Sequence, residues 1–282
     1  MKARKLLGWF CVWVLISGVA AAQGLYLKVG AGYNLGVPVL RIGTNFTENY
    51  YNTSSTSYTT ETNEGVYDSF GKGMGFDGAL GYTGETFGFE VGVQYKPTSS
   101  IELQSFENSY YSSSTSLETY TDNLKSSMLA ISPCFVFRTD IGFYGRAGIV
   151  LGFPQLTNEV KDESNGSNPS TSEYTSEYTG DMALGYTGAF GMAVGSGGLK
   201  LFVEANFVNL TWAPTKIEIT AYKVNGVDQL STLSPSNRVT HLEDSYTTDS
   251  RSSASSDQEG VGLKQYLPFS SLGLRAGIVI GF

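Results

Sequence analysis

From Leu25 onward, apolar residues alternate with small or polar residues at a period of two, the pattern of a β-strand with two different faces. Leu25, Leu27 and Val29, for example, alternate with Tyr26 and Lys28. The pattern predicts eight strands, at 25–37, 73–82, 87–96, 129–138, 141–152, 182–192, 199–207 and 271–282. Near Val208 the apolar parity slips toward Leu210 and Trp212, which predicts a β-bulge.

The connections between these strands fall into two classes. Three are tight turns, at 83–85, 139–140 and 196–198, and four are long segments rich in Ser, Thr, Asn and Tyr, at 41–71, 97–123, 154–178 and 215–265. All tight turns therefore lie at one end of the predicted strands. This is typical of a bacterial transmembrane barrel with short periplasmic turns and long extracellular loops.

The predicted fold is all-β: an eight-stranded antiparallel up-and-down transmembrane β-barrel with long extracellular loops. Ten strands is the alternative, if residues 215–233 add a hairpin. A soluble eight-stranded barrel would carry Lys, Glu and Thr on its second face, whereas that face here is mainly Gly, Ala and Ser. Small residues suit the narrow interior of eight strands. Leu, Val, Phe and Ile would then face lipid, and closure would satisfy the backbone hydrogen bonds.

The N-terminus has the pattern of a secretory signal peptide over residues 1–22. Lys2, Arg4 and Lys5 precede an apolar stretch, and Ala20-Ala21-Ala22 offers a cleavage site. The expected domains are thus a signal peptide at 1–22 and one outer-membrane barrel at 23–282. Removing three basic residues takes the net charge from −8 to −11 and leaves Cys134 as the sole cysteine, so no intramolecular disulfide is expected.

Composition narrows the function classes. The chain has 18 Lys and Arg against 26 Asp and Glu and a pI of about 4.8, which argues against a nucleic-acid partner. Aromatic residues make up 13% of the chain, too many for a disordered protein.

The last strand carries the sharpest resemblance to a known family. Leu272-Gly273-Leu274-Arg275-Ala276-Gly277-Ile278-Val279-Ile280-Gly281-Phe282 ends in Phe after alternating apolar residues. The chain resembles small bacterial outer-membrane β-barrel proteins of the OmpA/OmpX and porin-like class, as architecture over the whole mature chain. The resemblance implies that Phe282 is read by the barrel assembly machinery, and that the partners include outer-membrane lipid.

Three motifs that suggest chemistry have simpler explanations. The match to G-x-G-x-x-G at 73–78 lies inside a predicted strand, whereas a dinucleotide site needs it at a strand–helix junction. His241 is the only histidine and lies in a Ser-rich segment, which gives little support to an enzyme. Cys134 has the inward parity and is expected to be a small interior residue. We therefore predict no enzymatic activity, cofactor or metal.

Nine charged residues share the glycine-rich, inward parity: Lys28, Asp77, Glu90, Lys96, Arg138, Arg146, Lys200, Glu204 and Arg275. Buried charges must be paired or hydrated. They would form either a salt-bridged plug, which the narrow eight-stranded barrel favours, or a narrow polar pore with a slight anion preference from the basic excess.

The four long segments hold 4, 4, 5 and 7 acidic residues, which is 20 of the 26, and only 7 basic residues. They are also rich in Tyr and Ser, the chemistry of antibody paratopes. Two functions remain open: a structural or porin-like barrel, or a surface adhesin or receptor that binds an extracellular partner through these segments. Some of them are expected to be strands continuing beyond the membrane, such as Ile217-Glu218-Ile219 with a turn at Asn225-Gly226.

Overall fold

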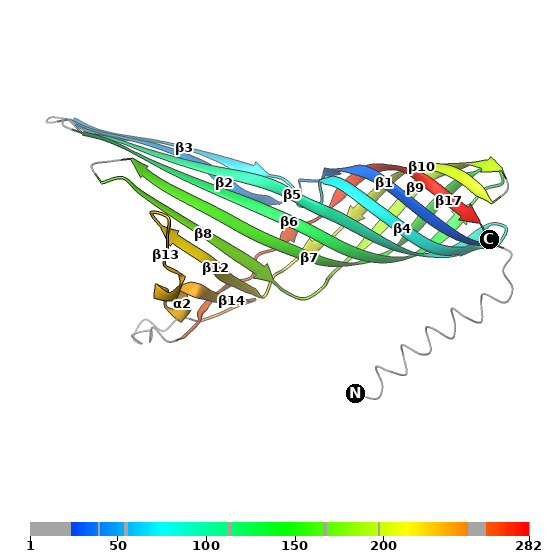
Figure 1. Cartoon of the computed structure of the whole chain (residues 1–282). Coiled ribbons are helices and arrows are strands. Elements are labelled where there is room, and N and C mark those ends of the chain that lie inside the picture. Colours follow the sequence, from blue (N-terminus) through cyan, green and yellow to red (C-terminus); the bar gives the residue numbers. More distant parts are fainter. Residues whose placement is uncertain are drawn as a thin grey trace.

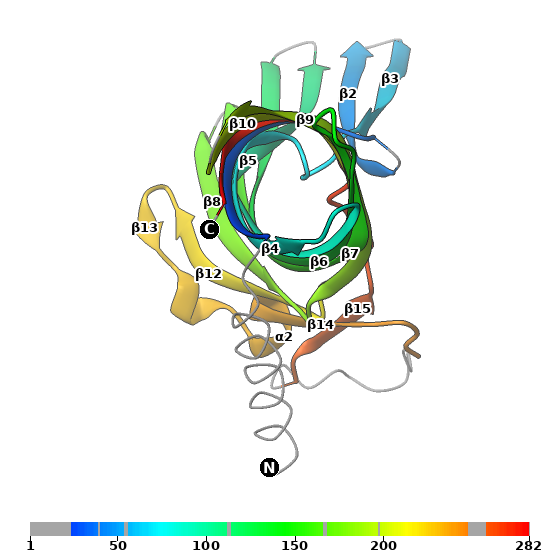
Figure 2. The ribbon, with the colours of Figure 1, turned by 90° about the vertical axis from the view of Figure 1, so that its right-hand side faces the viewer.

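The computed structural model describes residues 24–38, 40–53, 56–111, 114–165, 168–196, 198–247 and 258–281. Eight strands close into a barrel in which each pairs antiparallel with both neighbours (Figure 2). They are β1 (Leu25–Gly36), β4 (Gly73–Thr83), β5 (Phe87–Tyr111), β6 (Ser114–Arg138), β7 (Phe143–Asn165), β9 (Ala183–Ser196), β10 (Leu199–Asn209) and β17 (Ser271–Gly281). The last strand, β17, lies between β10 and β1 and so completes the barrel.

The predicted eight-stranded antiparallel barrel is confirmed, and the ten-stranded alternative is wrong. The segment expected to add a hairpin forms β12 (Lys216–Val224) and β13 (Val227–Asp228), and β12 pairs with β8 and β14 rather than with a barrel strand. The turn between them lies at Asn225 and Gly226, as predicted, with φ angles of 51° and 78°. The signal peptide at 1–22 and the terminal Phe282 lie outside the described residues.

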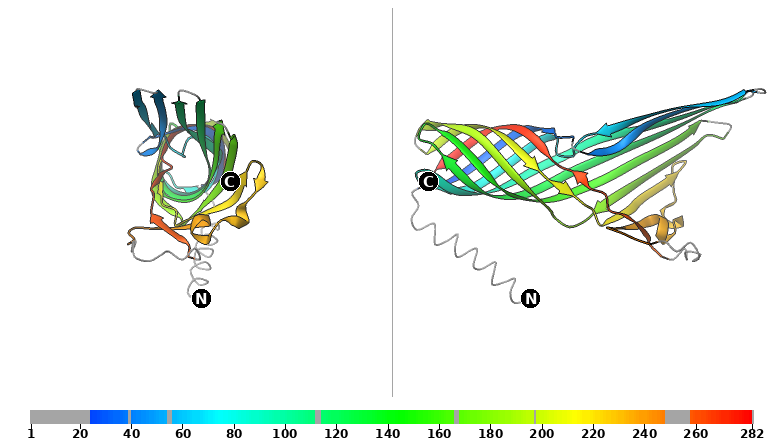
Figure 3. Two further views of the ribbon diagram at one scale, coloured as in Figure 1. Left: turned by 90° about the vertical axis from the view of Figure 1, so that its left-hand side faces the viewer. Right: turned by 180° about the vertical axis from the view of Figure 1, so that it is seen from behind.

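The long connections form a β-sheet extension rather than loops (Figures 1 and 3). The strands β5, β6 and β7 run on beyond the barrel, and the extension adds β2 (Arg41–Thr53), β3 (Thr56–Tyr67), β8 (Ser170–Thr179), β12, β14 (Val239–Glu243) and β15 (Gly260–Leu263). A 25-residue strand such as β5 or β6 is roughly 80 Å long at 3.3 Å per residue. Only residues 88–95 of β5 pair with the barrel strand β4, so more than half of β5 projects beyond the barrel.

Helical structure is confined to the 3₁₀ turn η1 (Leu230–Thr232) and the short helix α2 (Pro235–Arg238) among the described residues. None of the helices described in this chain has the length and apolarity needed to cross a membrane.

The outer wall of the barrel is apolar. Leu201, Val203 and Leu274 have 66%, 60% and 67% of their surface exposed. Exposed aromatic rings gather near both ends of the barrel strands, at Tyr82, Phe87, Phe89, Phe135, Phe137, Phe143 and Phe190 toward the tight turns and at Tyr33, Phe76, Tyr95, Phe153, Tyr186 and Phe207 toward the extension. Soluble proteins rarely expose an apolar surface of this extent.

The bulge predicted near Val208 is absent. Pairing of β10 with β9 and β17 runs without a register shift from Leu199 to Val208. Val208, Leu210 and Trp212 are all buried and continue the inward parity of Phe202 and Glu204. The sequence pattern changes there because the inward face itself becomes apolar.

Candidate functional site

The centre of the barrel is closed by a charged network around Glu204 of β10. One carboxylate oxygen, Oε2, accepts a hydrogen bond from Lys28 Nζ of β1 at 2.6 Å and another from the Tyr144 hydroxyl of β7 at 2.8 Å. The other, Oε1, accepts from Arg146 Nη2 of β7 at 2.7 Å. With only 1% of Glu204 exposed, these donors replace water around the carboxylate.

Arg146 extends the network to the opposite wall. Its Nη1 lies 3.3 Å from Glu90 Oε1 of β5, and Glu90 Oε2 also accepts from the Tyr26 hydroxyl of β1 at 2.9 Å. One guanidinium therefore joins two carboxylates, on strands that are not adjacent in the barrel. The planar guanidinium group carries several N–H donors in a fixed arrangement, so a single arginine can contact both carboxylates.

Arg275 of β17 and Asp77 of β4 complete the network more loosely. Arg275 Nε lies 3.7 Å from Asp77 Oδ1, and Arg275 Nη1 lies 3.8 Å from Glu204 Oε1. Neither Arg275 Nε nor Asp77 Oδ1 has a hydrogen-bond partner among the described residues. A cavity of about 20 Å³ borders both side chains and Glu90, and a volume of that order holds a single water molecule.

The nine charges predicted to face inward divide into a central network of six and three residues that lie nearer the two ends of the lumen. Lys28, Arg146 and Arg275 balance Asp77, Glu90 and Glu204, so the central network carries no net charge. The remaining three, which are all basic, lie nearer the ends. Lys96 Nζ donates to Gly71 O at 3.0 Å and to Ser271 Oγ at 2.9 Å, and it has no ion-pair partner among the described residues.

Arg138 and Lys200 line a cavity of about 120 Å³ at the end with the tight turns. The Arg138 guanidinium lies 5.5 Å from the centre of the Tyr26 ring and its Nη1 is 3.4 Å from Thr83 Oγ1. The basic excess expected for a pore is thus located at this end and at Lys96, and not in the central network.

Sequence reasoning missed the aromatic part of this network. Tyr26 and Tyr144 supply hydroxyl donors, and Phe202 is 1% exposed with its ring centre 4.5 Å from Lys28 Nζ. All three alternate in step with the predicted inward charges on their strands. Parity would have found them. Gly277 leaves room for Phe202, because a Cβ at Gly277 would lie 2.7 Å from that ring and 2.1 Å from Val29 O.

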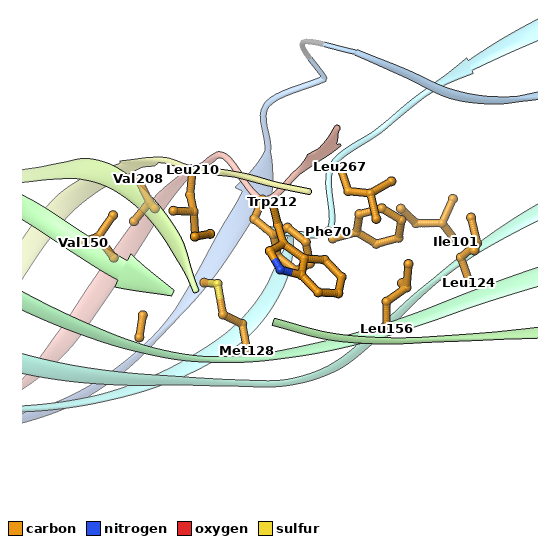
Figure 4. Packing of buried hydrophobic residues seen from close by; sticks show 13 residues of the cluster. Phe70, Ile101, Leu124, Met128, Val150, Leu156, Val208, Leu210, Trp212 and Leu267 are labelled. Carbon is orange, nitrogen blue, oxygen red and sulfur yellow. The ribbon is translucent and has the colours of Figure 1, made fainter. Parts of the chain in front are cut away.

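A second, apolar layer closes the lumen on the side of the extension (Figure 4). Leu210 and Phe269 are fully buried, and Trp212 is 1% exposed. We call this layer the apolar plug; its buried members are Phe70, Ile101, Leu124, Met128, Ala130, Val150, Leu156, Ala183, Val208, Leu210, Trp212, Leu267 and Phe269.

Two segments that follow or precede barrel strands hold the plug in place. β11 (Thr211–Trp212) pairs antiparallel with β16 (Leu267–Pro268), and Phe269 N donates to Leu210 O at 2.8 Å. Trp212 Nε1 donates to Asp181 O at 2.8 Å. These bonds give partners to the backbone groups of Leu210 and Phe269 and to the indole of Trp212, all of which are buried.

The other residues singled out from the sequence lie on three different strands. Cys134 is 1% exposed, and it lies on β6 directly opposite Glu90 of β5 in the barrel wall. His241 lies in β14 and its Nε2 contacts Glu259 Oε2, with about half of each side chain exposed. The glycines at 73–78 belong to β4, as expected from their position in an alternating strand. Within the described part of the chain, no three His, Cys, Asp or Glu residues are grouped as a metal site.

The extension has its own polar cluster, on the face that continues the lumen-facing parity; we call this the inner face. The hydroxyls of Tyr120 and Tyr174 lie 3.2 Å apart. Burial raises the pKa of Asp122 from 3.8 to about 6, against the lowering effect of a hydrogen bond from Asn158. Burial and the charge of Asp122 raise the pKa of Tyr178 to about 12.

No protein-family model, curated protein or solved structure matches this chain. The functional argument therefore depends on the geometry of the lumen and of the extension.

Proposed function

We propose that the protein is a bacterial outer-membrane barrel, similar to the small OmpA/OmpX class, whose lumen is closed and whose role is structural and surface-binding rather than pore-forming. The observation that carries this proposal is the two-layer closure. The charged network around Glu204 spans the lumen, and the apolar plug around Trp212 covers it. Ion passage would require both layers to open, and separating buried ion pairs is costly.

Outer-membrane location is supported by the wall of the barrel. Its apolar surface lies between two belts of aromatic rings, the arrangement of outer-membrane barrels. The strand β17, which precedes Phe282, closes the barrel between β10 and β1. We propose that the barrel assembly machinery reads Phe282, so its deletion would leave protein in the periplasm. Undiminished heat-modifiable barrel in outer-membrane fractions would contradict this.

Purified protein in planar lipid bilayers tests the closed lumen. We expect a silent baseline from the native chain. A double variant that weakens both layers, Glu204→Gln with Phe269→Ala, should show ion-current steps if it remains folded by its heat-modifiable migration. Stable single-channel steps from the native chain would instead favour the porin-like function.

Binding at the cell surface is favoured by the extension. The extension is not needed to close the barrel, because the eight barrel strands pair completely without β2, β3, β8 or β12. A shortened β2–β3 hairpin, in which residues 46–63 are replaced by Asn-Gly between the paired residues Asn45 and Glu64, would preserve the barrel. We expect it to lose adhesion to host or neighbouring cells relative to the native protein at equal surface display. Unchanged adhesion would count against this role for the hairpin.

A further inference from the structure

The inner face of the extension carries a row of four glutamates on four adjacent strands. Glu61 of β3 is directly opposite Glu48 of β2, Glu48 is opposite Glu107 of β5, and Glu107 is opposite Glu118 of β6. We call this set the glutamate row. At about 4.8 Å per strand, it spans roughly 15 Å.

Like charges directly opposite each other destabilise a sheet, and this row has no compensating base. None of its members forms an ion pair among the described residues. The pKa of Glu107 is raised by partial burial and by the charges of Glu118, Glu48 and Asp162. Four carboxylates therefore gather on one face of the sheet at a cost to the isolated protein.

The lysines of the extension lie on the opposite, outer face. Lys125 of β6 pairs with Glu159 at 2.6 Å, and Lys161 of β7 pairs with Glu163 at 2.8 Å. On β12, Lys216 and Lys223 alternate with the inner-face residues and so point outward. Within the described strands β3, β5, β6, β7, β8 and β12, no Lys or Arg other than Lys96 lies on the inner face of the extension. The one basic residue of β2, Arg41, is at the start of that strand, seven residues before Glu48. The lysines of β6, β7 and β12 are thus confined to the outer face, where they pair with some of its glutamates.

Buried acceptors continue the inner face toward the barrel. Asp122 Oδ1 and Asn158 Oδ1 have no hydrogen-bond partner among the described residues, and Asn158 is 8% exposed. Between these acceptors and the glutamate row lies Tyr120, whose hydroxyl contacts that of Tyr174. The face thus offers unpaired acceptors, carboxylates and aromatic rings. Ammonium and guanidinium groups would satisfy all three, by charge-assisted hydrogen bonds and cation–π contacts.

From this arrangement we infer that the inner face of the extension is a docking surface for a cationic polypeptide segment, rich in Lys or Arg, of another protein. The inference rests on the proposed surface-binding role and specifies its partner. A polypeptide fits better than a metal ion, because the carboxylates are distributed one per strand and no three are grouped for chelation in the described chain. One segment with several positive charges could contact the whole row.

Fluorescence anisotropy with labelled deca-lysine tests this inference on the full-length protein in phosphatidylcholine nanodiscs. We compare a triple variant of the row, Glu48→Gln, Glu107→Gln and Glu118→Gln, with a control on the outer face, Glu159→Gln, Glu163→Gln and Glu177→Gln. Both variants lose the same charge from the same sheet. We expect the row variant to raise the Kd at least tenfold and the control to change it less than twofold.

Equal weakening by the two variants would overturn the inference, because it would show attraction to net charge alone. Absence of deca-lysine binding to the native protein would also overturn it, as would displacement by millimolar Mg²⁺ but not by NaCl of equal ionic strength. The single variants Glu118→Lys and Glu163→Lys repeat the comparison if a triple variant does not fold. A conducting barrel would contradict the closed lumen but would leave this binding result unaffected.

Discussion

Arg146 Nη2 lies 2.7 Å from Glu204 Oε1 across the barrel, and the two side chains are 5% and 0% exposed. Their strands, β7 and β10, are separated by β9. This contact therefore supports the barrel through its interior, independently of the hydrogen bonds between neighbouring strands. It also occupies the centre of the lumen.

Glu204→Gln should destabilise the barrel by about 3–5 kcal/mol, because it leaves Arg146 and Lys28 buried beside a neutral amide. Urea unfolding in liposomes would measure the change. The control is Glu159→Gln, which breaks an exposed pair with Lys125 and should cost at most about 1 kcal/mol. Similar costs for the two variants would show that the network does not stabilise the fold.

Trp212 reports on the apolar plug. In a chain without residues 1–22 it is the only tryptophan, and its ring centre lies 6.3 Å from that of Phe269. Phe269→Ala should remove its packing partner, lower stability by about 3–5 kcal/mol and increase quenching of Trp212 fluorescence by acrylamide several-fold. Phe87→Ala, at a ring that is 73% exposed on the outer wall, should leave the quenching unchanged. Strong quenching of Trp212 in the native protein would show that water reaches the apolar plug and that this end of the lumen is open.

The sequence was sufficient to predict the barrel, since every barrel strand has large apolar residues on one face and small or charged residues on the other. It was not sufficient for the plug. Leu210 and Trp212 suggested a bulge because every apolar residue was assumed to point outward. Their inward position is favourable only because other apolar side chains of the plug pack around them in the folded structure. The glutamate row was also hidden, because the parallel pairing that places Glu48 opposite Glu107 joins two strands that are distant in the sequence. Inward charges could be predicted residue by residue, and the same parity would also have given Tyr26 and Tyr144, whose hydroxyls complete the hydrogen bonds.

Val203→Arg tests whether the wall of the barrel faces lipid. Val203 lies near the middle of β10, is 60% exposed, and its neighbours in the ladder are Met192 and Ala276. Arginine near the middle of a lipid-facing strand should cost about 2–4 kcal/mol in liposome unfolding. Val261→Arg, at a residue of the extension that is 45% exposed, should cost far less. If the two changes cost the same, the outer wall is in contact with water and the membrane proposal fails.

The stability of the extension should decrease as the pH rises from about 4 to about 6, because Asp122 ionises in this range. Burial raises the pKa of this carboxyl from 3.8 to about 6, so the folded state binds the proton more tightly than the unfolded state does. Ionisation therefore disfavours the fold: the cost is absent below about pH 4, grows through this window, and is complete above about pH 6. Asp122→Asn retains the side-chain shape without the charge. Amide hydrogen exchange of β6 and β7, corrected for intrinsic rates, should show several-fold higher protection in this variant than in the native chain at pH 7, and equal protection at pH 4. Asp228→Asn, on the exposed β13 strand, serves as the control and should not alter the pH dependence. A native extension equally protected at both pH values would show that Asp122 ionises without a cost.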